Sequence, residues 1–343
     1  MRVLVLTQEV APDAPASERD VLVQADAVRE ALESLGHDLR FASAGLDLAP
    51  LVELLAEPVD VVFNLVESLG GHDELQSLVP NLLELRAIPY TGCPASALAA
   101  TNDKPRLKAK LVSLGLPTPG WATWTSGSRR TLTLRGASTF HADRYIVKPA
   151  RCHASYGIDD SAIVEASSLA ELANHVRARE AQINVECFAE RFVEGRELNL
   201  ALLATPTGPR LLAFAEIDFG AFPPDQPRIV GHAAKWDEES FEYHHTPRRF
   251  WSPDEEHRLQ RLLAPMVLRC WNELWLDGAV RVDLRVDEQG EPWILEVNAN
   301  PCLSPDAGFM AAAARAGLTP ANVYRRLLDN ALERASAVTP LEV

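Results

Sequence analysis

Cysteine is scarce in this sequence, and the few cysteines that occur are spread along the chain. No two of them form a C-x-x-C pair, and the five are Cys93, Cys152, Cys187, Cys270 and Cys302. An odd number of scattered thiols argues against a disulfide framework, and the lack of a close pair argues against a structural zinc site. We therefore expect reduced thiols in a cytoplasmic protein.

Long hydrophobic runs and an excess of positive charge are also missing. The first residues, MRVLVLTQEV, contain an apolar run too short for a signal peptide, and no stretch approaches the roughly 20 residues of a membrane-spanning helix. The net charge is −15, from 33 Lys and Arg against 48 Asp and Glu. This balance disfavours non-specific binding to nucleic acid or to an anionic membrane, but it leaves room for a local basic pocket. We expect neither nucleic acid nor membrane as a partner.

What is present is the composition of an ordinary globular protein, long enough for two or three domains. The chain has 343 residues, of which 47% are hydrophobic and 24% charged. Short apolar strands such as RVLVL and DVVFNLV alternate with helical patterns, which predicts a parallel sheet covered by helices. We predict an α/β domain over residues 1–93 and two α+β domains over residues 94–186 and 187–343. The tryptophans, including Trp271, Trp275 and Trp293, are expected in the cores.

The stretch RVDLRVDEQGEPWILEVNANP predicts a β-hairpin whose two strands alternate with a period of two. If the turn is centred in DEQGEP, Asp283 faces Glu296 and Arg281 faces Asn298. Like charges directly opposite each other destabilise a sheet, and a cation between them would reverse that effect. Carboxylate and amide oxygens suit Mg²⁺ rather than Zn²⁺. A solvated sheet face remains the alternative for this pair taken alone.

Two lysines are placed where a phosphate could bind. Lys148 ends the apolar strand RYIVKPA, and the loop ARCHASYGI that follows has small residues that let backbone N–H groups approach an anion. Lys104 opens the helix in NDKPRLKAKLVSLG, where a cation is unfavourable unless an anion binds there. The alternatives are a surface lysine before a turn for Lys148 and, for Lys104, a solvated lysine on a helix that is capped by Asp103 or Asn102.

The segment ERFVEGRE, residues 190–197, joins two expected strands. An extended segment of this kind can offer backbone groups to the edge of an adenine ring, and Glu197 could accept hydrogen bonds from ribose hydroxyls. The alternative is a plain strand interruption in which Gly195 marks a bulge.

Taken together, these features resemble the ATP-grasp superfamily and, within it, the D-alanine–D-alanine ligase family. The order is a lysine at a helix start, a strand-end Lys-Pro with a small-residue loop, E-x-x-x-x-G-x-E, and R-x-D with E-x-N-x-N-P thirteen residues after the Asp. The segments PASERDVLVQADAVREAL, IPYTGCPASALAATNDK and NANPCLSPDAGFMAAAARAGL resemble further passages of that family, so the resemblance extends over nearly the whole chain. It implies an ATP-grasp fold whose last two domains clasp ATP, and it also implies a homodimer.

The resemblance implies a role for each matching residue. Those that would contact ATP are Lys104, Lys148, Glu190, Phe192, Val193, Glu197 and Lys235. Those that would hold two Mg²⁺ ions, for which Mn²⁺ could substitute, are Asp283, Glu296 and Asn298. The catalytic residues would be Arg281, Glu18 and Ser155, with Arg281 stabilising an oxyanion. The reaction would activate a carboxylate as an acyl phosphate, which the amine of a second small molecule attacks.

The amino-acid half of the site departs from the family pattern. Ala154 stands where the family has a Ser and Trp236 where it has a Tyr. The position of the family's His is taken by Val66 or Glu67. Further along, the Ser-Leu pair that receives the acceptor carboxylate is replaced by residues 307–308, with Asp306 beside it.

These changes predict a ligase with a diverged substrate pocket that includes Glu67, Trp236 and Asp306. The two acidic residues of that pocket suggest a substrate that carries positive charge. One alternative is a genuine D-alanine–D-alanine ligase of peptidoglycan precursor synthesis. The other, from a different class, is a regulatory nucleotide-binding protein without ligase activity.

Overall fold

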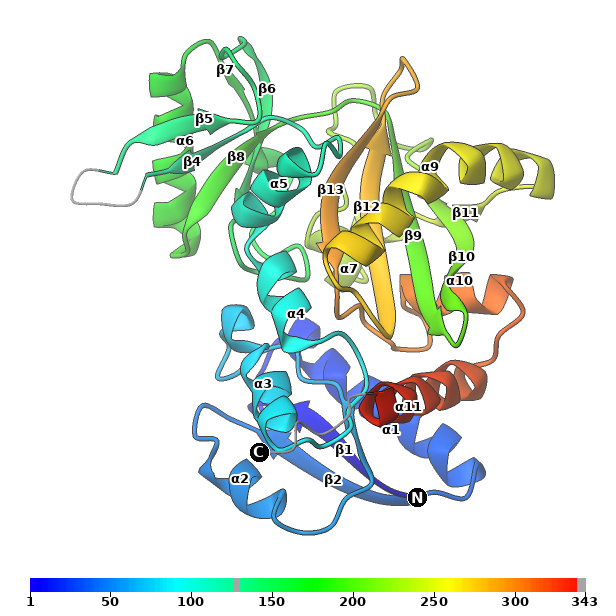
Figure 1. Ribbon diagram of the computed structural model, residues 1–343. Coiled ribbons are helices and arrows are strands. Elements are labelled where there is room, and N and C mark those ends of the chain that lie inside the picture. Colours follow the sequence, from blue (N-terminus) through cyan, green and yellow to red (C-terminus); the bar gives the residue numbers. More distant parts are fainter. Residues whose placement is uncertain (126–129, 338–343) are drawn as a thin grey trace.

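The computed structural model describes residues 1–125 and 130–337, which form three units (Figure 1). The N-terminal unit, blue in Figure 1, is a parallel sheet in the order β2-β1-β3 with helices around it. Strand β3 is buried along its whole length and β1 at every residue but its first, as in a sheet that is covered on both faces. This confirms the expected α/β beginning. Its elements are β1 (Arg2–Gln8), α1 (Ala16–Ser34), β2 (Asp38–Ala44), α2 (Ala49–Leu54), β3 (Val61–Asn64), η1 (Asp73–Leu75) and α3 (Leu78–Leu85).

The middle unit is an antiparallel sheet in the order β5-β4-β8-β6-β7, to which helix α6 is packed through Leu172 and Val176. The elements of this part of the chain are α4 (Ala95–Asn102), α5 (Lys104–Ser113), β4 (Trp121–Trp124), β5 (Leu132–Arg135), β6 (Asp143–Pro149), η2 (Asp160–Ala162), β7 (Ile163–Ala166), α6 (Leu169–Ile183) and β8 (Cys187–Arg191).

The C-terminal unit is a second antiparallel sheet, in the order β11-β10-β9-β12-β13. Its elements are β9 (Arg196–Thr205), β10 (Gly208–Ile217), α7 (Ala233–Trp236), α8 (Phe241–His244), β11 (Arg248–Phe250), α9 (Pro253–Glu273), β12 (Ala279–Val286), β13 (Pro292–Asn298), α10 (Gly308–Arg315) and α11 (Pro320–Ala337).

The units divide the chain differently from the expected boundary at residue 186. Strand β8 pairs with β4 and β6 and so belongs to the middle sheet, which places the crossing to the next sheet at residues 192–195. Helices α4 and α5, expected in the middle domain, instead contribute Leu98, Leu107 and Leu111 to the core of the C-terminal sheet. Strand pairing and helix packing between distant segments decide these memberships.

The two faces of the C-terminal sheet have different neighbours. Leu198, Leu200 and Leu202 of β9, with the even-numbered residues of β12, pack against α9, α4 and α5. On the opposite face, Ala201 and Leu203 pack with α10, α11 and the N-terminal unit. Because side chains alternate along a strand, the residues further along this second face are free to line a site.

The N-terminal and C-terminal units share one hydrophobic core. Helix α11, red in Figure 1, lies against α1, and its fully buried Tyr324 meets Phe63 of β3 edge to face, with ring centroids 5.8 Å apart. The shared core fixes these two units relative to each other. The middle unit is joined to them through less extensive contacts.

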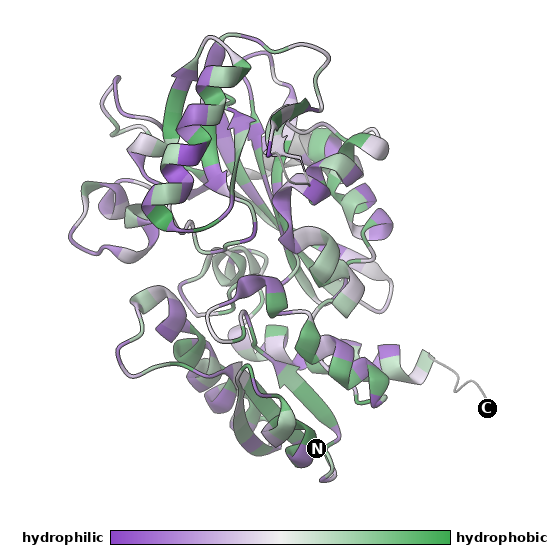
Figure 2. Cartoon of the chain, turned by 90° about the vertical axis from the view of Figure 1, so that its left-hand side faces the viewer, coloured by the Kyte–Doolittle hydropathy of each residue, from purple (hydrophilic) through white to green (hydrophobic). Residues whose placement is uncertain are grey.

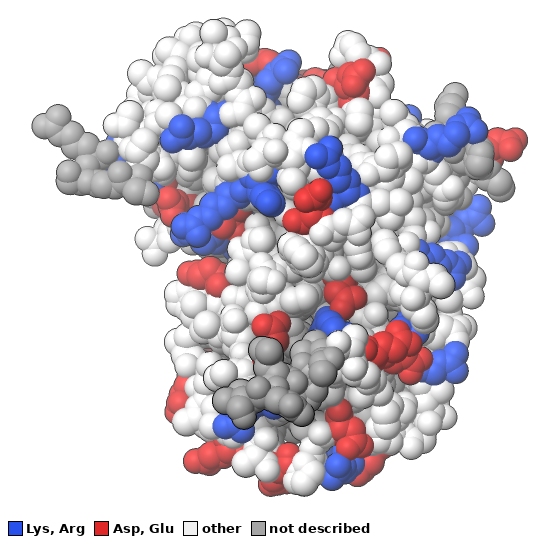
Figure 3. Space-filling view, viewed as in Figure 1, with Lys and Arg blue, Asp and Glu red and all other residues white. Residues whose placement is uncertain are grey.

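The surface agrees with the absences noted in the sequence. No helix within residues 1–125 and 130–337 is long and apolar enough to cross a membrane. The strands of the N-terminal sheet are mostly green in Figure 2, whereas the helices carry both colours, as expected for amphipathic helices on a buried sheet. On the face seen in Figure 3, acidic and basic side chains are interspersed.

Candidate active site

The hairpin register predicted from the sequence is confirmed. Asp283 pairs with Glu296 and Arg281 with Asn298 across β12 and β13. A bulge after Asp283 shifts the remainder of the hairpin, so that Ile294 and Val297, rather than alternate residues, are buried in the core. Strand β9 adds Asn199 opposite Asp283 and Glu197 opposite Arg285. We call the polar set on this side of the sheet the site face: Glu197, Asn199, Arg281, Asp283, Arg285, Glu296 and Asn298.

Asp283 is held in place by two donors on the site face. Arg281 donates from Nε to Oδ1 at 2.7 Å and from Nη2 to Oδ2 at 2.8 Å. The amide of Asn199 donates to Oδ1 at 2.8 Å. The carboxylate is therefore oriented before any cation binds, with its charge balanced by Arg281.

Glu296 faces a group of cations. Its Oε1 lies 3.8 Å from Lys104 Nζ and 3.9 Å from His153 Nδ1. Burial acts to raise the pKa of Glu296, but Lys104 and His153, together with Lys235, outweigh it and hold that pKa well below the ordinary value. Glu296 is therefore ionised at neutral pH.

The oxygen ligands of the site face fit Mg²⁺ only in part. Asp283, Glu296 and Asn298 supply oxygen atoms, which is the chemistry that Mg²⁺ prefers. Within the described residues, however, no three His, Cys, Asp or Glu side chains gather closely enough to hold a metal ion. Phosphate oxygens would have to complete the coordination, as is common for Mg²⁺ sites in which a nucleotide binds.

Lys104 points into the site from the start of α5. Asp103 caps the helix by accepting from Arg106 N at 3.1 Å, and the ammonium of Lys104 donates to Cys152 O at 2.6 Å. The side chain is buried and close to Glu296. The cap and the inward-facing lysine, weighed as alternatives in the sequence, therefore occur together.

Lys148 shares a buried carboxylate with a lysine that the sequence analysis missed. Lys148 Nζ lies 2.8 Å from Glu190 Oε1, and Lys108 pairs with the other oxygen of Glu190. Lys108 has no exposed surface, and it also donates to Thr118 Oγ1 at 2.7 Å. Burial lowers the pKa of Lys108 to about 8, although Glu190 acts to raise it. Its place between Leu107 and Leu111 on the apolar side of α5 was the available signal.

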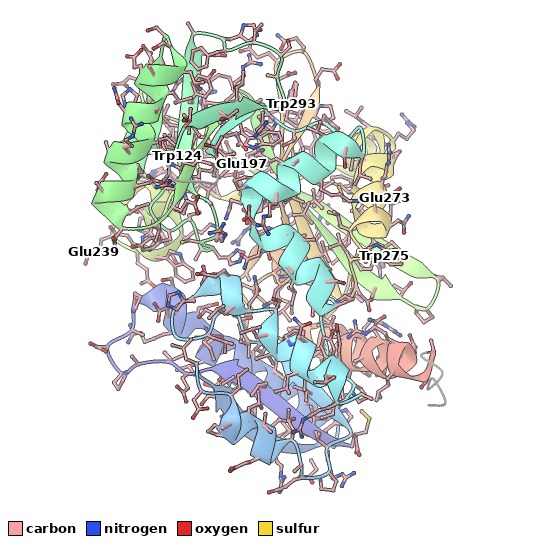
Figure 4. All side chains as sticks on the ribbon, turned by 60° about the vertical axis from the view of Figure 1, so that its left-hand side comes forward. Trp124, Glu197, Glu239, Glu273, Trp275 and Trp293 are labelled. Atoms are coloured by element: carbon pink, nitrogen blue, oxygen red, sulfur yellow. The ribbon has the colours of Figure 1, made fainter. Side chains whose placement is uncertain are left out.

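Glu197 and the segment that precedes it are tied together by Arg285. Arg285 donates to Glu197 Oε2 at 2.9 Å and to Val193 O at 2.7 Å, and it is almost fully buried. The ring of Phe192 lies between the guanidinium groups of Arg285 and Arg144, at 4.7 and 4.9 Å. Figure 4 shows Glu197 where the middle and C-terminal units face each other. The side chain of Glu190, in contrast, faces the two lysines described above.

Two loops meet over the site. The first loop contains Ala154 and Ser155, which both have positive φ. The second loop comprises residues 229–236. Ser155 Oγ donates to Val230 O at 3.0 Å, and Trp236 Nε1 donates to Ala154 O at 3.1 Å. His232 N donates to Ile158 O at 2.8 Å. These contacts form a lid, which we define as residues 151–158 together with residues 229–236.

The lid also carries charged groups toward the site face. His153 N donates to Asp73 Oδ2 at 2.7 Å, and its Nε2 lies 3.0 Å from Gln76 Nε2, so the loop is anchored to the N-terminal unit. Loss of solvent lowers the pKa of Lys235, Arg281 lowers it further, and Glu296 acts against both. His153 was not singled out from the sequence, in which nothing distinguishes it from other loop residues.

Acidic groups of the N-terminal unit lie on the other side of the site. Glu67 Oε1 accepts from Gln24 Nε2 at 2.8 Å, and Asp20 accepts from Ser304 Oγ at 2.8 Å and from Cys302 Sγ at 3.0 Å. Burial raises the pKa of Glu67 to about 7, although the bond from Gln24 acts to lower it. Asp20, one turn before Gln24 on α1, lies within the passage PASERDVLVQADAVREAL that resembles the family, but no role was predicted for it from the sequence.

Two of the expected site residues lie away from this cluster. Glu18 is exposed on α1, and among the described residues no hydrogen bond or ion pair joins it to Ser155. The side chain of Asp306 is exposed. Its contact with the site region is made by its backbone oxygen, which accepts a hydrogen bond from Arg248 Nη1 at 2.9 Å.

A separate cavity of about 350 Å³ lies beside Phe192 and Val193. It is lined by residues 118–120, which precede β4, and by the hairpin turn at residues 287–289, and Trp293 borders it. None of the lysines and none of the site-face carboxylates line it, so the charged site described above is a different place.

The chain is similar to known ligases along nearly all of its length. Residues 111–329 match the family described as D-ala D-ala ligase C-terminus. A D-alanine–D-alanine ligase of Methylococcus capsulatus is 32% identical, with 94% of this chain and 93% of that protein covered. One from Synechococcus is 29% identical, with 93% and 91% covered.

A solved structure has the same fold. The D-alanine–D-alanine ligase of Bacillus anthracis, complexed with ATP, superimposes with a TM-score of 0.72 over 98% of this chain and 99% of that one, at 18% identity. This supports the expected ATP-grasp fold, with its parallel N-terminal sheet and two antiparallel sheets. On the family match and the relatives, the chain belongs to the D-alanine–D-alanine ligase family and is an ATP-dependent ligase that forms a carbon–nitrogen bond.

Proposed function

We propose that this ligase activates the carboxylate of one amino-acid-like substrate as an acyl phosphate and joins it to the amine of a second, in a pocket that has diverged from that of its relatives. The observation that carries the proposal is the site face, on which Arg281, Asp283 and Glu296 lie together, with Lys104 of α5 beside Glu296. Such a group of cations and oxygen ligands suits a nucleotide triphosphate with its metal ions.

The cations of the site would bind the phosphates. Lys104 and Lys148 approach from α5 and β6, and Lys235 approaches from the lid. Asp283, Glu296 and Asn298 would hold two Mg²⁺ ions. When bound, these ions supply neutralisation of the charge that develops during phosphoryl transfer. Glu197, fixed by Arg285, would accept the ribose hydroxyls, and the backbone of residues 190–193 would meet the adenine.

Arg281 would stabilise the oxyanion that forms when the amine attacks the acyl phosphate. Its guanidinium is ordered by Asp283 and lies beside the acidic groups of the site, so little reorganisation is needed at the moment of reaction. The lid would exclude water, because an acyl phosphate that meets water is hydrolysed instead of transferred.

A change of substrates is supported by how the altered positions are used. The positions at which the family has Glu, Ser and Tyr are occupied here by Glu18, Ala154 and Trp236. Glu18 is exposed, and Trp236 donates to the backbone of Ala154, so these three side chains do not form a polar set here. The polar groups near the substrate are instead Asp20, Gln24 and Glu67. A site that recognises a substrate through hydrogen bonds discriminates strongly, so such replacements favour a different substrate.

Ligation of two D-alanines is the second candidate, because the relatives of 29% and 32% identity are named for that reaction. The regulatory alternative without activity is disfavoured by the membership of the ligase family.

The test is ADP release by the purified protein with Mg-ATP and a panel of single and paired amino acids in both configurations, with the products identified by mass spectrometry. We expect stimulation by a pair other than D-alanine with itself, and loss of turnover in Glu296→Gln. Glu291→Gln, exposed in the turn of the same hairpin, is the matched control. Stimulation by D-alanine alone with a dipeptide product would contradict the diverged pocket. Turnover that survives in Glu296→Gln would contradict the assigned metal ligand.

A further inference from the structure

Arg179 is a buried arginine on α6 that has no part in the site described so far. It is only 4% exposed, and every N–H group of its guanidinium has an acceptor. Nε and Nη2 both donate to Gly157 O, at 3.2 and 2.7 Å. Nη1 donates to Ser161 Oγ and to Gln182 Oε1, both at 2.9 Å, and Nη2 lies 2.9 Å from Asp159 Oδ2. Because a buried cation is costly unless it is paired and hydrogen-bonded, this set of contacts strongly determines the local structure.

All but one of these acceptors belong to residues 157–161, where the first loop of the lid ends. A second contact brings the same segment close to α6. Gly157 has a φ of +62°, and a methyl group added to it would lie 2.6 Å from Ile183 Cδ1. Arg179 and this close approach together hold residues 157–161 on α6. Lysine could not replace Arg179 here, because its ammonium lacks the planar fork that reaches several acceptors at once.

The residue after Gly157 joins the two loops of the lid. Ile158 O accepts from His232 N at 2.8 Å. A methyl group added to Gly231 would lie 2.7 Å from the same oxygen, so the two backbones are in direct contact at this point. The side chain of Ile158 packs against a small core that includes Ile229 of the second loop. The second loop is therefore seated on the segment that Arg179 holds.

His232 in turn fixes the start of α7. It is the residue before this helix, and its backbone oxygen accepts from the N–H groups of Lys235 and Trp236, both at 3.1 Å. Hydrogen bonds therefore lead in short steps from α6 through Ile158 to Lys235, the residue of the lid that is proposed to bind a phosphate.

We propose that Arg179 is a positioning residue of this ligase, which holds residues 157–161 on α6 and, through the junction of Ile158 with His232, keeps Lys235 over the nucleotide site. The inference rests on the ligase function proposed above and adds to it a residue that touches neither nucleotide nor substrate. Arg179 belongs to the middle unit and Lys235 to the C-terminal unit. The junction therefore links the position of the middle unit to that of a phosphate-binding group.

The positional link can be measured without any substrate. Hydrogen exchange of the free protein is followed by mass spectrometry in wild type, Arg179→Met and the control Arg177→Met, whose arginine is exposed on the same helix. We expect the amides of residues 229–236 to exchange about tenfold faster or more in Arg179→Met, because a loosened segment lets the bond from His232 to Ile158 open more often. Arg177→Met should exchange like wild type. Faster exchange that is confined to residues 157–161 and α6 would overturn the proposal.

A double-mutant cycle with Lys235 separates positioning from general stabilisation. The Kd of a non-hydrolysable ATP analogue with Mg²⁺ is measured by calorimetry for wild type, Arg179→Met, Lys235→Met and the double variant. We expect Arg179→Met to weaken binding about tenfold when Lys235 is present and less than about twofold when it is absent, because residues that act as one unit are not additive. Equal weakening in both backgrounds would show that Arg179 only stabilises the fold, and would overturn the proposal.

Two milder variants keep the test decisive if Arg179→Met does not fold. Arg179→Lys keeps the charge but not the fork, and Gly231→Ala pushes Ile158 O away from the second loop without touching α6. Both should speed the exchange of residues 229–236 and weaken binding of the analogue, and wild-type behaviour of both would overturn the proposal. If wild type binds no analogue, the proposed ligase function fails, whereas the exchange of residues 229–236 still decides whether Arg179 positions the second loop.

Discussion

Arg281 and Asp283 form a two-point ion pair on the same strand, with Nε–Oδ1 and Nη2–Oδ2 distances of 2.7 and 2.8 Å. One partner is the residue proposed to stabilise an oxyanion and the other a proposed metal ligand. While they neutralise each other, neither is fully available for its task. A bound cation that takes part of the charge of Asp283 would leave Arg281 freer to act on substrate, so metal binding and the readiness of Arg281 would be linked.

The first prediction follows from this pairing. Asp283 is engaged by Arg281, Glu296 faces Lys104, and no third acidic side chain joins them among the described residues. Mg²⁺ alone should therefore bind only weakly, whereas Mg²⁺ with a non-hydrolysable ATP analogue should bind at least tenfold more tightly, because phosphate oxygens complete the coordination. Isothermal titration with and without the analogue measures the difference. Tight binding of Mg²⁺ to the protein alone would contradict the assigned ligand set.

Arg281 itself can be tested by a change that keeps its charge. In Arg281→Lys the two-point bond to Asp283 is lost and the ammonium cannot reproduce the planar fork. We expect kcat to fall by roughly 10²- to 10³-fold, the cost of removing an oxyanion donor, with the KM of ATP changed less than threefold. Steady-state kinetics with saturating substrates measure both. A loss confined to the KM of ATP would assign Arg281 to nucleotide binding instead.

Lys108 supports the nucleotide half of the site without facing it. Replacing it by methionine leaves Glu190 with Lys148 alone, so the ammonium of Lys148 should be drawn more firmly to Glu190 and away from a phosphate. We expect the KM of ATP to rise about tenfold, equivalent to about 1.4 kcal/mol, with a smaller change in kcat. Lys110→Met, exposed on the same helix, is the control. An unchanged KM of ATP together with a lower melting temperature would make Lys108 purely structural.

The local pattern of the hairpin was enough to predict which residues face each other. A turn of known length fixes the register on both sides of it, so Asp283 and Glu296 could be paired from the sequence. The bulge after Asp283 could not, because residues 293–295 are all apolar and so do not mark the position at which the two-residue alternation shifts. The place of β8 in the middle sheet was missed for a related reason: its partners, β4 and β6, are distant in the chain.

The residues of the candidate site fall into the same two groups, those that the sequence pattern predicts and those that only the fold brings together. Residues within recognisable motifs, such as Lys104 and Glu296, do approach one another. Partners from outside the motifs, such as Arg248, become visible only when the fold brings their elements together. Trp275 illustrates the opposite error: expected in the core, it is 77% exposed in a positive-φ conformation just after α9 (Figure 4).

The lid offers a test of water exclusion. In Trp236→Phe the hydrogen bond from Nε1 to Ala154 O is lost while the ring remains, so the two loops should separate more often. We expect ADP release without product formation to rise several-fold, because water then reaches the acyl phosphate. Trp275→Phe, on an exposed tryptophan away from the lid, is the control. The ratio of ADP to ligated product measures the effect, and an unchanged ratio would show that this contact does not limit closure.

Glu67 should make stability depend on pH. Burial raises its pKa in the folded protein to about 7 from 4.5, so between these values the folded state binds more protons than the unfolded state. Stability contributed by Glu67 is therefore present below pH 4.5 and is lost as the pH rises through 7, by up to about 3 kcal/mol. Glutamine in its place removes this loss, so the stability of Glu67→Gln relative to wild type should increase between pH 5.5 and 8.5. Urea unfolding at the two pH values measures it, with Glu33→Gln on the exposed side of α1 as the control.

If Glu67 binds an ammonium group, wild type should also gain affinity for that substrate over the same pH interval, and Glu67→Gln should not. A relative stability that is the same at both pH values would mean that Glu67 is already ionised at pH 5.5, and its place beside Asp20 would then need a bound cation to be tolerated.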